Sequence, residues 1–91
     1  MKLSFLRYQI DELDSKILKL FLKRISICRK IAEFKKSNHI PIENSSRENE
    51  ILKTVKLFSG EDFIYSEELF KKIFSICKKA QKAEMEDNLH E

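Results

Sequence analysis

The chain has 91 residues, of which 36% are charged, and a formal net charge of +3. It contains one glycine and one proline, which excludes a fold of many short strands joined by tight turns and favours a few long helices. No apolar run approaches the roughly 20 residues of a membrane span, and the mild, mixed charge does not indicate a nucleic-acid-binding protein. We therefore expect one all-α domain over 1–91.

The first predicted element is a long helix over about 3–37. Apolar residues recur there at alternating steps of three and four, and neither glycine nor proline interrupts them. At ~1.5 Å per residue such a helix is roughly 50 Å long, well beyond a compact body with a radius of gyration of ~12 Å. We expect a second copy of the chain to cover the apolar seam in an intertwined homodimer. The seam comprises Leu3, Leu6, Ile10, Leu13, Ile17, Leu20, Ile27, Ile31 and Phe34.

A polar loop and a short helix are predicted next. The loop covers 38–44 and contains Pro41, which cannot continue a helix. The residues from Ser45 to Glu48 match the S-x-x-E capping box and indicate a second helix over about 46–58. Its expected buried side is Ile51, Leu52, Val55 and Phe58.

Gly60 is expected to end the second helix, because glycine readily adopts the left-handed backbone that follows many helices. A third helix is predicted over about 63–85, with Gln81 as a polar member of an apolar stripe. The predicted architecture is thus three helices: long, short, long. The stripe of the third helix comprises Leu69, Phe70, Ile73, Phe74, Cys77 and Ala80.

The two cysteines, Cys28 and Cys77, lack the CxxC or CxxH spacing of a zinc site and give no disulfide framework. The first residues contain no apolar run of signal-peptide length before charges appear. These features predict a cytoplasmic protein with reduced thiols. We expect no metal and no cofactor.

Arg24 occupies a seam position at which the pattern calls for an apolar side chain. A charge there is costly unless something satisfies it, either an acidic residue of another helix or an anionic ligand. It could also be a polar residue that sets the register of the seam. Lys35 lies eleven residues later on nearly the same face, ~16 Å further along, so both cations could hold a small dianion. Arg7 lies ~25 Å before Arg24 and could reach such a pocket only from an antiparallel partner chain.

These residues, in this order, resemble the all-helical (AroQ-class) chorismate mutases. The resemblance covers the chain from Leu3 to about Ala83. It implies that chorismate is converted to prephenate, a Claisen rearrangement on the route to phenylalanine and tyrosine, in an intertwined dimer with two sites. The matching motifs are R-x-x-I-D-x-L-D from Arg7 to Asp14, Arg24, Lys35, Pro41-Ile42, Arg47-Glu48 and F-x-x-I-F-x-x-C-x-x-x-Q from Phe70 to Gln81.

The resemblance assigns three arginines to the two substrate carboxylates: Arg7 of the partner subunit, Arg24 and Arg47. Guanidinium forks can grip both carboxylates and hold the compact shape that the rearrangement needs. In the empty protein we expect Arg24 to pair with water, Glu48 or a buffer anion.

The other implied residues act on the remaining oxygens of chorismate. Lys35 and Gln81 would donate hydrogen bonds to the ether oxygen, where charge builds as the carbon–oxygen bond breaks. Glu48 would accept the ring hydroxyl. Because Gln81 does not titrate, unlike the Glu of some relatives, activity should not require acidic pH.

Two positions depart from the family pattern. Asn44 stands where many relatives carry Asp just before the second helix. It should still cap that helix, but it is neutral, so its contact with the ring hydroxyl would differ. Cys77 stands where many relatives have Ser, and a thiol is only a weak hydrogen-bond donor. Both are counted among the candidate substrate-binding residues.

Three other functions are alternatives to the mutase. An isochorismate-pyruvate lyase shares the fold, but the Arg47-Glu48 pair favours the mutase. A non-catalytic dimer that senses an aromatic metabolite would not need all the polar residues named above. The third alternative is a nucleic-acid-binding helical module. Most lysines of the chain have acidic neighbours, which is typical of solvated faces, and they form no nucleic-acid-binding motif. The sequence leaves open whether the mutase is free-standing or part of a fusion.

Overall fold

The computed structural model describes residues 2–89, with side chains through residue 86. All regular elements in this range are helical, so the predicted all-α class is confirmed. The sequence had placed the three helices at about 3–37, 46–58 and 63–85. The observed elements are α1 (Lys2–Ser37), α2 (Ser45–Ser59), the short 3-10 helix η1 (Gly60–Asp62) and α3 (Phe63–Leu89).

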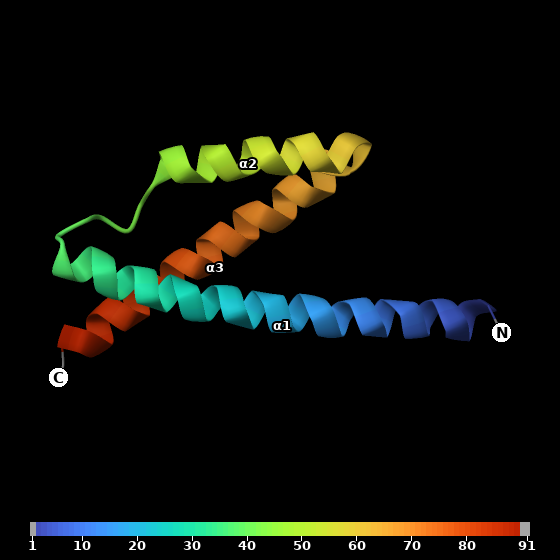
Figure 1. Ribbon diagram of the computed structural model, residues 1–91, viewed down its shortest axis with the longest axis horizontal. Coiled ribbons are helices and arrows are strands. Elements are labelled where there is room, and N and C mark those ends of the chain that lie inside the picture. The colour runs from blue at the N-terminus through green and yellow to red at the C-terminus, as the bar shows by residue number, and fades with distance from the viewer. Residues whose placement is uncertain (1, 90–91) are drawn as a thin grey trace.

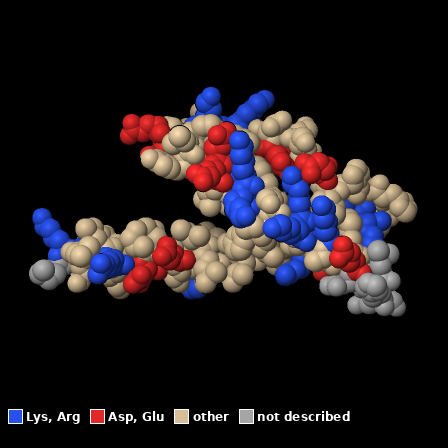
Figure 2. All heavy atoms as spheres, turned by 180° about the vertical axis from the view of Figure 1, so that it is seen from behind, with Lys and Arg blue, Asp and Glu red and all other residues tan. Residues whose placement is uncertain are grey.

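Helix α1 projects far beyond the rest of the molecule (Figure 1). Its C-terminal half crosses α3, and α3 also packs against α2. The chain measures 55 × 29 × 14 Å, and its radius of gyration of 16.6 Å exceeds the ~12 Å of a compact chain of this length. Acidic and basic side chains are mixed over the face seen in Figure 2.

The small core lies where α1 crosses α3. Helix α1 contributes Ile25, Cys28 and Ala32, and α3 contributes Phe74 and the polar Gln81. The packed stripe of α1 therefore lies next to the predicted seam. The small side chains at 28 and 32 let α3 approach closely, whereas the seam pattern was drawn from the larger Leu, Ile and Phe residues.

The predicted seam is exposed in the single chain. In the projecting half of α1 its six apolar side chains are 52–67% exposed. Apolar patches of this kind mark surfaces at which a protein meets another molecule. The six are Leu3, Leu6, Ile10, Leu13, Ile17 and Leu20.

Asn44 starts α2, and the predicted capping box is wrong. The Asn44 side chain accepts a hydrogen bond from the backbone N–H of Arg47 at 3.0 Å. Asn and Ser cap helices about equally well. With Asn44 as the cap, α2 begins at Ser45, one residue earlier than it would begin with Ser45 as the cap. The carboxylate of Glu48 is thereby left free for other contacts.

The buried side of α2 is narrower than predicted. Ile51, Leu52 and Val55 are half-buried, but Phe58 is 83% exposed, so its predicted burial is wrong. Gly60 ends the helix as predicted, with a φ of 55° that a side chain would strain. The turn then leads directly into α3.

Cys28 and Cys77 form a disulfide between α1 and α3, so the prediction of reduced thiols is wrong. Their Cα atoms lie 6.0 Å apart because the two helices cross at these residues. Sequence spacing could not reveal a pair that only the crossing brings together. The predicted cytoplasmic location loses the support that it drew from reduced thiols. Among the described residues, no helix is long and apolar enough to cross a membrane.

Candidate active site

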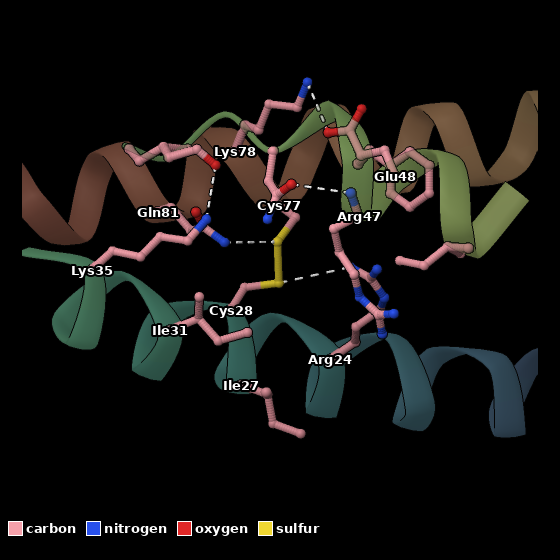
Figure 3. Close-up of a pocket in the computed structure, with 14 residues that line it drawn as sticks. Arg24, Ile27, Cys28, Ile31, Lys35, Arg47, Glu48, Cys77, Lys78 and Gln81 are labelled. Atoms are coloured by element: carbon pink, nitrogen blue, oxygen red, sulfur yellow. Dashed lines mark hydrogen bonds and ion pairs between the residues drawn. A yellow bond between two sulfur atoms is a disulfide. The ribbon is translucent and has the colours of Figure 1, made fainter. Parts of the chain in front are cut away.

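A pocket of about 430 Å³ lies between the C-terminal half of α1, the start of α2 and α3 (Figure 3). This volume falls within the range of small-molecule sites. Its polar lining consists of Arg24, Lys35, Asn44, Arg47, Glu48, Lys78 and Gln81, with the disulfide at one wall. Its apolar lining consists of Ile27, Ile31, Ile42, Ile51 and Phe74.

The pocket brings together every predicted site residue except Arg7. Arg24 and Lys35 come from one face of α1, Asn44, Arg47 and Glu48 from the start of α2, and Cys77 and Gln81 from α3. Arg7 lies exposed on the projecting half of α1, away from this pocket.

Arg24 is half-buried in the pocket wall. Its guanidinium lies over the Phe74 ring, 5.9 Å from the centroid, and donates to Cys28 Sγ at 3.7 Å. Burial, and then the positive charge of Arg47, lower the pKa of Arg24. None of the ion pairs among the described residues involves Arg24. Glu48, one of its predicted partners, is paired with Lys78 instead. Within the described part of the chain, Arg24 is thus a partly dehydrated cation without a carboxylate partner.

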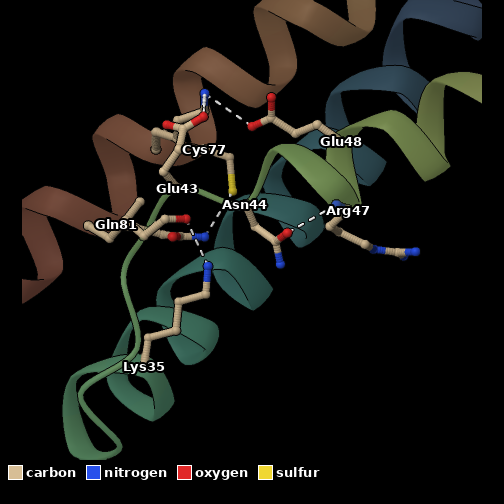
Figure 4. Close-up of polar contacts among 9 residues, drawn as sticks. Lys35, Glu43, Asn44, Arg47, Glu48, Cys77 and Gln81 are labelled. Carbon is tan, nitrogen blue, oxygen red and sulfur yellow. Dashed lines mark hydrogen bonds and ion pairs between the residues drawn. The ribbon is translucent and has the colours of Figure 1, made fainter.

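Lys35 and Gln81 lie on facing walls at one end of the pocket (Figure 4). Lys35 Nζ donates to the backbone carbonyl of Ile42 at 2.9 Å. Gln81 is only 5% exposed, and its Nε2 donates to Cys77 Sγ at 3.4 Å. The buried Oε1 of Gln81 has no hydrogen-bond partner in the described structure. Sulfur is a weak acceptor, so the amide of Gln81 retains most of its hydrogen-bonding capacity.

Asn44 and Arg47 have partners of their own. The side-chain oxygen of Asn44 caps α2, which gives this departure from the family pattern a structural task. Arg47 forms a surface ion pair with Glu50 at 3.5 Å, and both side chains are more than 60% exposed. Exposed pairs of this kind stabilise a protein little, so Arg47 can turn towards a ligand at small cost.

Lys78 also lines the pocket, and the sequence analysis missed it. Its Nζ lies 3.0 Å from Glu43 Oε1. It also lies 3.1 Å from Glu48 Oε2, a contact drawn in Figure 3. Lys78 donates hydrogen bonds to Glu43 and Glu48, and these hydrogen bonds raise the pKa of Lys78. The signal that could have identified Lys78 is its position three residues before Gln81, which places both on a similar face of the helix.

Cys77 lines the pocket as half of the disulfide. A disulfide sulfur carries no hydrogen, so the weak donor expected here is absent and the sulfur can only accept. The apolar wall was not predicted as part of the site, although Ile27 and Ile31 follow Arg24 at helical steps of three and four. Within the described residues, no cluster of three or more His, Cys, Asp or Glu side chains is placed to hold a metal.

Comparison with known proteins identifies the family. Residues 6–82 match the family described as chorismate mutase type II. The chain is 37% identical over 90 residues to the chorismate mutase of Methanocaldococcus jannaschii, covering 99% of this chain and 90% of that protein. It is 29% identical over 87 residues to the bifunctional chorismate mutase/prephenate dehydratase of Aquifex aeolicus, covering 89% of this chain but 24% of that protein.

No solved structure matches the chain significantly. The family match nevertheless spans all the pocket residues from Arg24 to Gln81, and it also includes Arg7. The chain therefore belongs to the chorismate mutase type II family and has the isomerase activity of that family, chorismate mutase.

Proposed function

We propose that this pocket binds chorismate and that its side chains, without a covalent intermediate, promote the rearrangement to prephenate in phenylalanine and tyrosine synthesis. The observation that carries the proposal is the meeting of Arg24, Lys35 and Arg47 around one cavity of about 430 Å³, with Glu48 and Gln81 in the same walls. The cations suit the two carboxylates of chorismate. The apolar remainder of the wall excludes water and strengthens each electrostatic contact.

Arg24 and Arg47 are proposed to grip the carboxylates. Burial and the charge of Arg47 both disfavour the charged form of Arg24. A bound dianion would relieve both effects, because it supplies counter-charge where two cations lie near each other. Substrate binding would therefore stabilise Arg24, and the two guanidinium groups would hold chorismate in the chair-like shape required for bond formation.

Lys35 and Gln81 are proposed to act on the ether oxygen. Lys35 has three N–H donors and uses one on Ile42, so another is available for the substrate. Gln81 Nε2 donates to a sulfur, which is a weak acceptor. Donating to the negative charge that develops on the ether oxygen instead would give a stronger hydrogen bond. Donors that meet more charge in the transition state than in the ground state raise kcat.

Glu48 is proposed to accept the ring hydroxyl of chorismate. Its Oε2 contacts Lys78, and its Oε1 forms no ion pair in the described structure. The rearrangement requires no proton transfer, so this carboxylate does not act as an acid or a base. Its contribution is orientation of the ring, which brings the two reacting carbons together.

A second copy of the chain is proposed to complete the site. The projecting half of α1 exposes six seam residues that need a cover, and a second α1 would provide one. In such an intertwined dimer, Arg7 of the partner subunit would approach the pocket that contains Arg24. Both the apolar seam and the isolated position of Arg7 support this arrangement.

The test is turnover of chorismate by the wild type, followed by loss of the diene absorbance with identification of the product. Arg24→Ala should lower kcat/KM by about 10³-fold, because a buried carboxylate contact is lost. Arg29→Ala is the matched control, since Arg29 is exposed on the same helix and does not line the pocket. Wild-type turnover by Arg24→Ala would contradict the proposed site. Release of pyruvate from isochorismate would identify the lyase.

A further inference from the structure

Lys78 links three parts of the pocket that are separate in sequence. From α3 its Nζ reaches Glu43 in the loop at 3.0 Å and Glu48 in the first turn of α2 at 3.1 Å. The side chains of Lys78 and Glu48 are 29% and 26% exposed, so their ion pair is partly shielded from water. Glu43 is the more exposed partner, at 59%.

The contact with Lys78 restrains the carboxylate of Glu48. A glutamate side chain has several rotatable bonds, and fixing it for a ligand costs conformational entropy at the time of binding. Lys78 holds Oε2, which leaves Oε1 as the oxygen available for a ligand. The restraint is thus in place before a ligand arrives.

The same contact offsets part of the negative charge, because the one positive charge of Lys78 is shared between the carboxylates of Glu43 and Glu48. A free carboxylate in the pocket would repel an anionic ligand, and the apolar wall strengthens that repulsion. Lys78 places a positive charge beside Glu48, and the hydrogen bonds of the two glutamates favour its protonated form. A glutamate can then face a dianion without excluding it.

We propose that Lys78 is a positioning residue of the mutase: it holds Glu48 with one oxygen free for the ring hydroxyl and offsets part of the charge of Glu48 towards the dianionic substrate. This inference rests on the proposed function, because it takes Glu48 as the hydroxyl acceptor. Lys78 itself does not touch the reacting atoms. Its effect on the reaction passes through Glu48.

The experiment is a double-mutant cycle that measures kcat and KM with chorismate. Lys78→Met is made in the wild type and in Glu48→Ala, with Lys79→Met as the matched control because Lys79 is exposed on the next position of α3. In the wild type, Lys78→Met should raise KM about 10- to 100-fold with a smaller change in kcat. Lys79→Met should leave both constants unchanged.

The decisive comparison is the effect of Lys78→Met when Glu48 is absent. A residue that acts through Glu48 should then change kcat/KM by less than about threefold. An equal loss in both backgrounds would mean that Lys78 contacts the substrate directly and would overturn the inference. An unchanged KM in Lys78→Met would overturn it as well.

A conservative variant is the control for misfolding. Lys78→Arg retains the positive charge and can still donate to both Glu43 and Glu48. Its KM should therefore be close to that of the wild type. Failure of Lys78→Arg to recover it, in a variant with wild-type circular dichroism, would count against the inference. A wild type that forms no prephenate would instead refute the proposed function, so the two failures are distinguishable.

Discussion

The two halves of α1 have one sequence pattern and different surroundings. Seam residues from Leu3 to Leu20 are all exposed, whereas the half that follows packs Ile25, Cys28 and Ala32 against α3. An apolar seam therefore indicates that a helix has a partner without identifying the partner. In the second half, α3 is the partner and uses a neighbouring stripe. In the first half, the described chain provides none.

The halves also divide the predicted site. Arg24 and Lys35 lie in the pocket-forming half and Arg7 in the projecting half. If the projecting half serves a neighbouring chain, each pocket needs both halves, one from each copy.

Mixing two inactive variants should restore activity. Arg7→Ala and Arg24→Ala should each lose about 10³-fold in kcat/KM as homodimers. After unfolding together and refolding, half of the molecules should be mixed dimers with one intact site, which gives about a quarter of wild-type activity. Chorismate turnover before and after mixing measures this. A mixture that stays inactive would mean that Arg7 does not act across chains.

A charge in the projecting seam should separate the copies. Leu13→Lys would place an ammonium group between two apolar faces, costing more than the roughly 2–3 kcal/mol lost with a buried leucine. Light scattering after size exclusion should show a monomer, with turnover lost in parallel. Glu12→Lys, exposed at the adjacent position, is the control. An unchanged mass for Leu13→Lys would remove the seam from the interface.

Loss of the disulfide should weaken the pocket-forming half. The bond joins residues 49 positions apart, and chain-entropy arguments give about 4 kcal/mol for closing a loop of that length. Urea unfolding at fixed protein concentration should show that the free energy of unfolding of Cys28→Ala/Cys77→Ala is lower than that of the wild type by an amount of that order. A dithiol reductant should destabilise the wild type similarly and leave the double variant unchanged. Equal stability with and without reductant would contradict a bond in the folded protein.

The smallest expected effect is the pH dependence of the Lys78 bridge. Its pKa lies above the ordinary lysine value of 10.5 in the folded chain, so its stabilisation is fully present below that value and is lost as pH rises through the folded pKa. The difference in unfolding free energy between wild type and Lys78→Met should be constant from about pH 7 to 9 and shrink above about pH 11. Lys79→Met should show no such trend.

Much of the fold could be predicted because the chain has few ways to turn. With one Pro and one Gly, the breaks around Pro41 and at Gly60 were visible, and between them the apolar steps indicate helices. The packed stripe of α1 was missed for a physical reason. Cys28 and Ala32 are small, and pattern reading favours the larger residues beside them, although small residues permit the closest helix crossing.

The site could be predicted as far as its residues have characteristic types. Arg24 was conspicuous because a cation interrupted an apolar seam. Lys78 was not, because only its position three residues before Gln81 separates it from Lys71, Lys72, Lys79 and Lys82. Its partners Glu43 and Glu48 become neighbours only when the loop folds back beside α3. The disulfide was missed for the same reason, since two cysteines 49 positions apart become neighbours only where helices cross.

The disulfide also changes what a cut in the backbone would do. It closes a covalent ring that runs from Cys28 through the loop, all of α2 and η1 to Cys77. Cleavage at one peptide bond in the loop between α1 and α2 would open the ring without dividing the molecule. The fragment with Arg24 and Lys35 would remain tied to the fragment with Arg47 and Gln81, and the two would part on a denaturing gel only after reduction.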